Sequence, residues 1–314
     1  NYCLIGPYFP QTASIEFERL DHDDSIFSKV AQDLRSQGID AFYGRWLVTG
    51  NPNIILVDFQ QALSQIDALK FELWERHKIS TLNSEPLVSS VIAFGHQVRS
   101  YISSFVNAKP RSQEVVVHFH EWMASTALLD LKKDNLPVST VFTTHATMLG
   151  RYIAGNSDDF YERLSSYNWE KEAKFYGIEA QAAIERLSAQ YCHVLTTVSE
   201  VTARECEVFY GRTCDLILPN GLNITRFAAT HEFQNLHLKY KQKINFFQSY
   251  SWDLDNTLYF FTSGRYEYKN KGYDLTLEAL KRLNFKIVQS GLDITVVMFI
   301  ITRNPVFSID PQVL

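Results

Sequence analysis

Two basic residues, Arg265 and Lys271, lie in a short loop whose composition suits the binding of a diphosphate. The loop belongs to LYFFTSGRYEYKNKG, residues 258–272, where a Ser-Gly pair breaks an apolar run of strand length. Apolar residues at helical spacing follow, so the order is strand, loop, helix. Such a loop lies at the carboxyl end of its strand, where open α/β sheets bind ligands, and a guanidinium and an ammonium beside helix N–H groups suit a diphosphate. The alternative is that both side chains are solvated loop charges.

A second cluster, HFHEW, runs from His118 to Trp122 at the end of a predicted buried strand. His118 and His120 lie on the same side of that strand, which permits a metal site or a polar cluster that contacts a sugar. A zinc hydrolase would need further ligands downstream, and only His145 and scattered acids follow. The third interpretation is packing of a His and a Trp at a strand–helix turn.

The same arrangement recurs one strand later in TTHATMLGRYIAG, residues 143–155. His145 comes just past the strand, and Arg151 lies near the start of the next helix, from which an Arg can reach an anion between two domains. The alternative for His145 is a capping residue with satisfied hydrogen bonds. The alternative for Arg151 is a charge on the surface of a helix. Asn223, in PNGLN, belongs to a hinge with cleft-facing amides or to a plain turn. Polar clusters thus follow at least three strands, which favours a cleft between two α/β domains.

The predicted elements alternate between strand and helix and favour a parallel, doubly wound sheet with a domain boundary near Pro219. No GxSxG, Walker loop or Cys/His dyad supports a hydrolase or a kinase. Strands are predicted at residues 2–5, 41–43, 54–58, 115–118, 139–144, 194–198, 215–218, 258–261 and 294–302. Helices are predicted at residues 24–37, 89–106, 122–132, 148–154, 157–190, 201–209, 231–247 and beyond Gly272.

Composition indicates a globular protein of two domains. The 314 residues are 46% hydrophobic and 21% charged, and the net charge of −5 argues against nucleic-acid or anionic-membrane binding as the main activity. Four cysteines without a CxxC motif indicate reduced, buried thiols and a cytosolic setting. No transmembrane run or secretory signal is visible. Because the chain starts at Asn1 and ends soon after a strand, we expect both ends to continue.

The motifs described above, HFHEW, TTHATMLGRYIAG, PNGLN and LYFFTSGRYEYKNKG, resemble those of the glycogen synthase family of animals and fungi. Members of this family are retaining glucosyltransferases with two Rossmann-like domains in the GT-B arrangement. The resemblance implies an acceptor-side domain in residues 1–218, a hinge and helical insertion in 219–257, and a truncated nucleotide-sugar-binding domain in 258–314. The matching segments are YGRWL (43–47), HFHEWMAS (118–125), FTTHATMLGRYIAG (142–155), TTVSEVTARE (196–205), LPNGLNITRF (218–227), HEFQNLH (231–237) and DNTLYFFTSGRYEYKNKGYD (255–274).

The resemblance implies transfer of glucose from a nucleotide-glucose donor to the 4-hydroxyl at a glucan non-reducing end, with retention and an α-1,4 link. Arg265 and Lys271 resemble the pair that holds the donor diphosphate and stabilises the leaving group. His145 resembles the histidine that contacts the donor glucose, so these three residues are the expected catalytic residues. Arg151 resembles a cleft arginine near the donor phosphates, and Asn223 resembles a further donor contact.

Glu121 resembles an acidic residue of the family that lines the acceptor side, and His120 is expected on the same side. The resemblance implies that no metal or other cofactor takes part, and that the donor is UDP-glucose rather than ADP-glucose. It also implies a cytoplasmic protein that forms a tetramer through the insertion. The family's Gly-Gly donor loop has no counterpart before Asn1, and its glutamate pair would lie beyond Leu314, so we expect this fragment alone to be inactive. The alternative is a non-catalytic glucan-binding or assembly subunit of the same fold.

Overall fold

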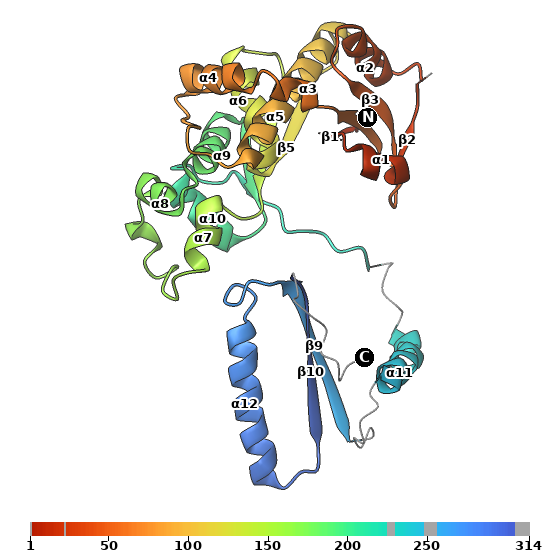
Figure 1. The fold of residues 1–314 in the computed structure, drawn as a ribbon, viewed down its shortest axis with the longest axis vertical. Coiled ribbons are helices and arrows are strands. Elements are labelled where there is room, and N and C mark those ends of the chain that lie inside the picture. The colour runs from red at the N-terminus through yellow and green to blue at the C-terminus, as the bar shows by residue number, and fades with distance from the viewer. Residues whose placement is uncertain (1, 22, 225–229, 248–255, 305–314) are drawn as a thin grey trace. The chain divides into compact units, whose positions relative to one another are not determined.

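The structure, a computed structural model, describes residues 2–21, 23–224, 230–247 and 256–304. It divides into two compact units, and Figure 1 labels many of their elements. Unit 1 comprises Asn1–Tyr152 and Asp159–Asn220, and unit 2 comprises Ile153–Asp158 and Gly221–Leu314. The roles expected for the two parts of the chain, acceptor side and donor side, stay predictions.

A four-stranded parallel sheet in unit 1 carries the predicted histidine clusters. Its order is β5-β6-β7-β8, and the register pairs His120 with Thr143 and Thr144 with Thr197. The carboxyl ends of these parallel strands therefore meet at one edge, and the predicted clusters HFHEW and TTHATMLGRYIAG lie at it. Arg265 and Lys271 follow a strand of another sheet, so the prediction that all the clusters share one sheet edge was wrong. The strands are β5 (Val116–His120), β6 (Ser139–Thr144), β7 (Val194–Thr197) and β8 (Leu216–Ile217), joined in part by α6 (Glu121–Lys133) and α10 (Glu200–Phe209).

The link between β6 and β7 differs from the single helical region predicted at residues 157–190, and that prediction was wrong. Helix α8 begins where the Asn168 side chain accepts the Lys171 N–H, and it ends at Gly177, whose φ of +67° suits a residue without Cβ. These two residues separate the region into short helices. The elements of the link are α7 (Met148–Ala154), the 3₁₀ turn η1 (Leu164–Ser166), α8 (Trp169–Tyr176) and α9 (Glu179–Tyr191).

The second sheet of unit 1 is mixed, in the order β1-β4-β3-β2. Strands β1 and β4 are parallel, whereas β3 runs antiparallel to both β4 and β2. The short link between Trp46 and Asn53 explains the antiparallel pairing of β3 with β4, because a parallel pair would need a long crossover connection. The α/β class is confirmed, with this antiparallel part as an addition. The strands are β1 (Leu4–Pro7), β2 (Phe17–Arg19), β3 (Ala41–Trp46) and β4 (Asn53–Val57).

Helices α2 and α5 cover this mixed sheet and begin at clear sequence signals. Ser25 caps α2 by accepting the Ser28 N–H, and Pro86 occupies the first turn of α5, where no N–H partner is needed. The helices of this part are α1 (Pro10–Glu16), α2 (Ile26–Ser36), α3 (Gln60–Leu63), α4 (Ile66–His77) and α5 (Pro86–Ala108).

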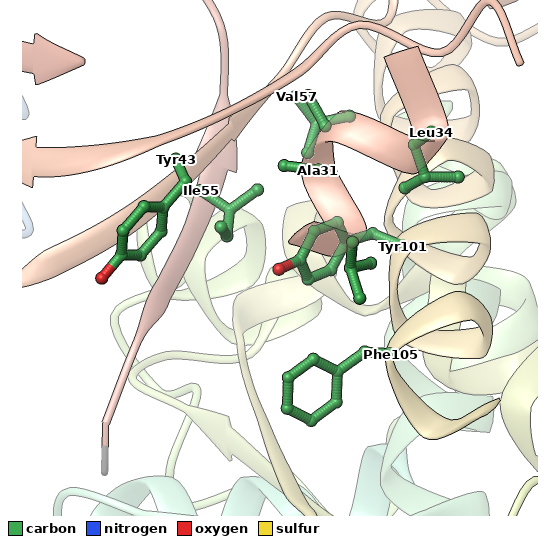
Figure 2. Packing of buried hydrophobic residues seen from close by; sticks show 9 residues of the cluster. Ala31, Leu34, Tyr43, Ile55, Val57, Tyr101 and Phe105 are labelled. Atoms are coloured by element: carbon green, nitrogen blue, oxygen red, sulfur yellow. The ribbon is translucent and has the colours of Figure 1, made fainter. Parts of the chain in front are cut away.

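Apolar side chains from α2, α5, β3 and β4 form a buried core (Figure 2). Within it, the Tyr101 hydroxyl donates to the Phe27 carbonyl at 3.0 Å, so its polar atom is satisfied. Burial also raises the pKa of Tyr101. The core members are Val30, Ala31, Leu34, Ala41, Tyr43, Ile55, Val57, Tyr101 and Phe105.

We expect Leu34→Ala to lower the free energy of unfolding by about 2 to 5 kcal/mol, because it removes buried methyl groups and leaves a cavity. Leu34 is 1% exposed, whereas Leu82 is 94% exposed and serves as the matched control. Urea unfolding of both variants measures the effect. Equal unfolding midpoints for Leu34→Ala and Leu82→Ala would contradict this view of the core.

Unit 2 contains the predicted strand–loop–helix segment. Strands β9 (Thr257–Arg265) and β10 (Thr295–Arg303) are parallel and are linked by α12 (Tyr273–Ser290) (Figure 1). The expected break at Ser263-Gly264 was wrong: pairing with β10 carries the strand through to Arg265. Helix α11 (Thr230–Phe247) matches the helix predicted at residues 231–247, and its assignment as an insertion and its role in association stay predictions. Residues 225–229 and 248–255 of the expected hinge and insertion, and 305–314 of the expected second domain, lie outside the described residues.

Two further findings bear on the class of protein. Among the described residues, no helix is long and apolar enough to cross a membrane. All four cysteines are free thiols, with Cys192 and Cys206 buried, as predicted, and Cys3 and Cys214 half-buried. The cytosolic setting stays a prediction.

Candidate functional site

Glu121 connects the two histidine clusters of unit 1. It follows β5 directly, and its Oε1 accepts the backbone N–H of His145 at 2.8 Å. The same oxygen lies 4.0 Å from a guanidinium nitrogen of Arg151. His145 and Arg151, which the sequence placed after the next strand, are thus gathered around one carboxylate. The role of Arg151 in binding an anion stays a prediction.

The backbone of Glu121 is unusual, with a φ of +63°. A residue with a Cβ is strained in this left-handed region by about 1 to 2 kcal/mol, and such residues are frequent at functional sites. The conformation turns the chain sharply from β5 into α6. As a result, the carboxylate is presented at the carboxyl edge of the sheet.

We expect Glu121→Gly to be more stable than Glu121→Ala by about 1 kcal/mol, because glycine is not strained at positive φ. The control position is Glu200, the first residue of α10, which is not among the described non-glycine residues with positive φ. There Ala should be the more stable replacement, because of its helix propensity. Thermal unfolding of the four variants gives the comparison, and the same Ala preference at both positions would contradict the assigned strain.

Three imidazoles form a row at this edge. The rings of His118 and His120 stack with centroids 4.1 Å apart, and His145 Nε2 lies 3.5 Å from His120 Nδ1. Desolvation lowers the pKa of both His118 and His120, and the neighbouring histidines add to the effect. Both rings are therefore neutral near pH 7 and can exchange hydrogen bonds with hydroxyl groups.

The two histidines in HFHEW have different hydrogen-bonding partners in the structure. His118 Nε2 lies 2.6 Å from Thr143 Oγ1, which agrees with the packing interpretation for this residue. His120 instead faces the His145 ring. Among the described residues, no group of three or more His, Cys, Asp or Glu side chains could hold a metal ion. The metal-site interpretation has no geometric support in that part of the chain.

Two cavities lie beside this sheet. One of about 380 Å³ is lined by apolar residues of β1 and α5 and by the chain from Gln113 to His120, which includes all of β5. A larger one of about 560 Å³ lies at the amino-terminal ends of the strands, beside Val115 and Ser139, and contains none of the predicted site residues. Of the predicted site residues, His120 lines the smaller cavity, at the carboxyl end of β5, where parallel sheets bind ligands.

Behind the predicted residues lie two buried carboxyl groups that the sequence analysis did not identify. Glu185 Oε2 accepts the Met148 N–H at 2.9 Å, and Glu205 Oε2 accepts the Thr147 hydroxyl at 2.7 Å. The spacing of Glu185 in the sequence does indicate its burial. It lies three residues after Ala182 and four before Ala189, so it shares their buried helix face. Glu205 likewise lies three residues after Thr202 and four before Phe209, on the buried face of α10.

In unit 2, the structure brings Arg265 and Lys271 to the end of β9. Arg265 is exposed and its Nε contacts Glu267 at 3.1 Å. The Lys271 stem crosses Gly264, where an added Cβ would lie 3.2 Å from Lys271 Cδ. The buried Tyr273 hydroxyl donates to the carbonyl of Arg265 at 3.2 Å, which anchors the loop to the following helix. Two exposed cations on an anchored loop suit a diphosphate.

Asn223 is exposed and lies in unit 2, in the segment that follows Asn220. Unit 1 therefore offers neutral imidazoles and a carboxylate, which can bind sugar hydroxyls, with an arginine beside them. Unit 2 offers two cations. The groups of unit 1 suit the binding of sugar hydroxyls, and those of unit 2 suit the binding of a phosphate anion.

Comparison with known proteins identifies the family. A protein-family model described as glycogen synthase matches residues 1–313. The chain is 43% identical over 307 residues to the glycogen [starch] synthase of Neurospora crassa, covering 96% of this chain and 43% of that protein. It is 41% identical to isoform 1 of Saccharomyces cerevisiae and 37% identical to the liver enzyme of Rattus norvegicus, covering 96% of this chain and 44% of each. The chain thus spans less than half the length of these relatives, and it belongs to the glycogen synthase family.

Proposed function

We propose that the protein containing this chain is a glycogen (starch) synthase, a retaining glucosyltransferase. It transfers glucose from a nucleotide-glucose donor to the 4-hydroxyl at the non-reducing end of a glucan and forms an α-1,4 link. The observation that carries the proposal is the family match over residues 1–313. The clusters at the strand ends of each unit support it, because they contain the group types that this transfer needs.

Arg265 and Lys271 are proposed to bind the donor diphosphate and to act in catalysis. Negative charge grows on the leaving diphosphate as the glycosidic bond breaks, and fixed cations stabilise that charge most in the transition state. Glu267 holds Arg265 by an ion pair at 3.1 Å. An exposed pair of this kind contributes less than about 1 kcal/mol, so it orients the guanidinium without preventing anion binding.

His145 is proposed to contact the donor glucose, and Arg151 is proposed to contact the donor phosphates. Glu121 supports both assignments, since it binds the His145 backbone and lies beside Arg151. Glu121 and the adjacent His120 are proposed to face the acceptor glucan, and Asn223 is proposed as a further donor contact.

The remaining expectations are also proposals. UDP-glucose is the expected donor in preference to ADP-glucose, and we propose that no metal or other cofactor takes part, because two cations supply the charge compensation. The exposed side chains of α11 between residues 233 and 240 support its proposed role in tetramer formation. A cytoplasmic location is proposed because all four cysteines are free thiols.

The direct test measures transfer of labelled glucose to glycogen by the protein at its natural length, with UDP-glucose and ADP-glucose supplied separately. Transfer from one donor, with the new glucose released by an enzyme that cleaves α-1,4 links, would support the proposal and name the donor. No transfer from either donor, with glycogen still bound, would contradict it and favour a glucan-binding subunit.

A further inference from the structure

Two carboxyl groups from different helices meet at the first turn of α7, and both are almost fully buried. Glu185 of α9 is 2% exposed and Glu205 of α10 is 5% exposed. Burying a carboxyl group costs several kcal/mol unless its hydrogen bonds are replaced. Here both groups bind the segment that begins α7: Glu185 accepts the Met148 N–H, and Glu205 accepts the hydroxyl of the fully buried Thr147.

Thr147 extends this support into the helix. Its Oγ1 accepts the Gly150 N–H at 2.9 Å, and its carbonyl accepts the Arg151 N–H at 3.1 Å. The first N–H groups of a helix lack partners within the helix, so these contacts determine where α7 begins. The second oxygen of Glu205 is bound as well, because Oε1 accepts the Tyr161 hydroxyl at 2.9 Å.

We propose that Glu185 and Glu205 are positioning residues for glucosyl transfer, because they fix the start of α7 and thereby the orientation of His145 and Arg151. Glu121 holds the same segment from the other side through the His145 N–H. The inference rests on the proposed function, since it assumes that His145 and Arg151 contact the donor. A displacement of about 1 Å in such groups lowers the rate about 10²-fold.

The protonation of Glu185 gives this role a distinctive pH dependence. Burial raises its pKa to about 8, so near pH 7 the group is neutral. Its Oε2 then accepts the Met148 N–H. Its Oε1 is buried and makes no hydrogen bond of good geometry. The Tyr210 hydroxyl is nevertheless close enough to interact with the carboxyl group. The titratable or charged groups that face it are Glu121, Arg151, Tyr210 and Cys206.

The direction in which pH changes stability follows from the pKa of Glu185 in the folded and unfolded states. The pKa of Glu185 is about 8 in the folded protein, against a reference value of 4.5. The folded state therefore binds the proton more tightly, and its stability falls as the pH rises from 4.5 through about 8. Ionisation places a negative charge in a buried site behind α7, where the attraction of Arg151 does not offset the cost of burial. We expect transfer activity to decline as the pH rises through about 8 for this reason.

The test compares Glu185→Gln, Glu185→Ala and Glu205→Ala in the protein at its natural length. Glutamine keeps an oxygen for the Met148 N–H but cannot ionise. The exposed residues Glu179 and Glu207 lie on the same two helices, so their Ala variants are the controls. The readouts are kcat and KM as a function of pH, and amide hydrogen exchange of residues 145–151, which requires no activity.

We expect Glu185→Gln to keep wild-type kcat at pH 7 within about threefold and to lose the decline near pH 8. Glu185→Ala and Glu205→Ala should lower kcat about 10²-fold and accelerate exchange in α7, with KM for glycogen within about threefold. The controls should match wild type. Exchange faster than wild type in the Ala variants would support the positioning role even if wild type showed no transfer, which would overturn only the proposed function.

Two results would overturn the inference. In the first, the decline near pH 8 persists in Glu185→Gln. In the second, α7 exchanges at the wild-type rate in both Ala variants. Should the Ala variants fail to fold, the pH profile of Glu185→Gln decides alone.

Discussion

Lys271→Ala is expected to lower kcat for glucosyl transfer by about 10²- to 10³-fold, a loss typical of removing one group that stabilises transition-state charge. The ammonium is presented by a loop anchored through the Tyr273 hydroxyl, and its stem is held against Gly264 at the end of β9. The substitution removes the ammonium and leaves the Tyr273 anchor of the loop in place. Because that charge matters most when the leaving diphosphate forms, KM for the donor should change less than kcat.

The matched control is Lys281→Ala on α12, an exposed lysine 3.6 Å from Glu278, and its kcat should equal that of wild type. Steady-state kinetics with UDP-glucose and glycogen measures both variants. Lys271→Arg retains the charge but adds bulk beside Gly264, and we expect an intermediate loss. A Lys271→Ala variant with wild-type kcat would contradict the assignment of Lys271 to the diphosphate, whatever its effect on KM.

The elements that the sequence predicted best are those with strong local signals. Strand β6 and helix α7 have the predicted bounds, because an apolar run is followed by a polar break and then by a new helical pattern. The errors lie where tertiary contacts or caps override the local pattern. Pairing with β10 extends β9 through Gly264, and Gly177 divides a region that has helical composition on both sides.

In the candidate site, too, local sequence signals predicted some features, whereas features set by tertiary structure could not be predicted. Its polar residues could be located because they follow strands whose carboxyl ends share a sheet edge. The left-handed conformation of Glu121 could not be predicted, because nothing in its residue type favours positive φ. Nor could the partners of Thr147 and Met148, because Glu185 and Glu205 reach them across 37 and 58 residues of chain.

Gly150→Ala is expected to disturb the same support from inside α7. A Cβ at this position would overlap Glu205 Oε2 and lie 2.6 Å from Thr147 Oγ1, so either the helix or the carboxyl must move. Overpacking of this kind costs about 1 to 3 kcal/mol, and the better helix propensity of alanine offsets about 1 kcal/mol of it. We expect kcat to fall about 10²-fold because Arg151 is displaced, with a smaller loss of stability.

The control is Gly6→Ala in β1, where the nearest atom to an added Cβ is 3.6 Å away and ordinary contact results. A double-mutant cycle then identifies the cause. If the alanine methyl acts by pushing the Glu205 carboxyl, Gly150→Ala should cost far less in a Glu205→Ala background than in wild type, because the obstructing group is gone. Additive losses of kcat in the double variant would show that the two residues act independently, and α7 would then owe its position to contacts other than Glu205.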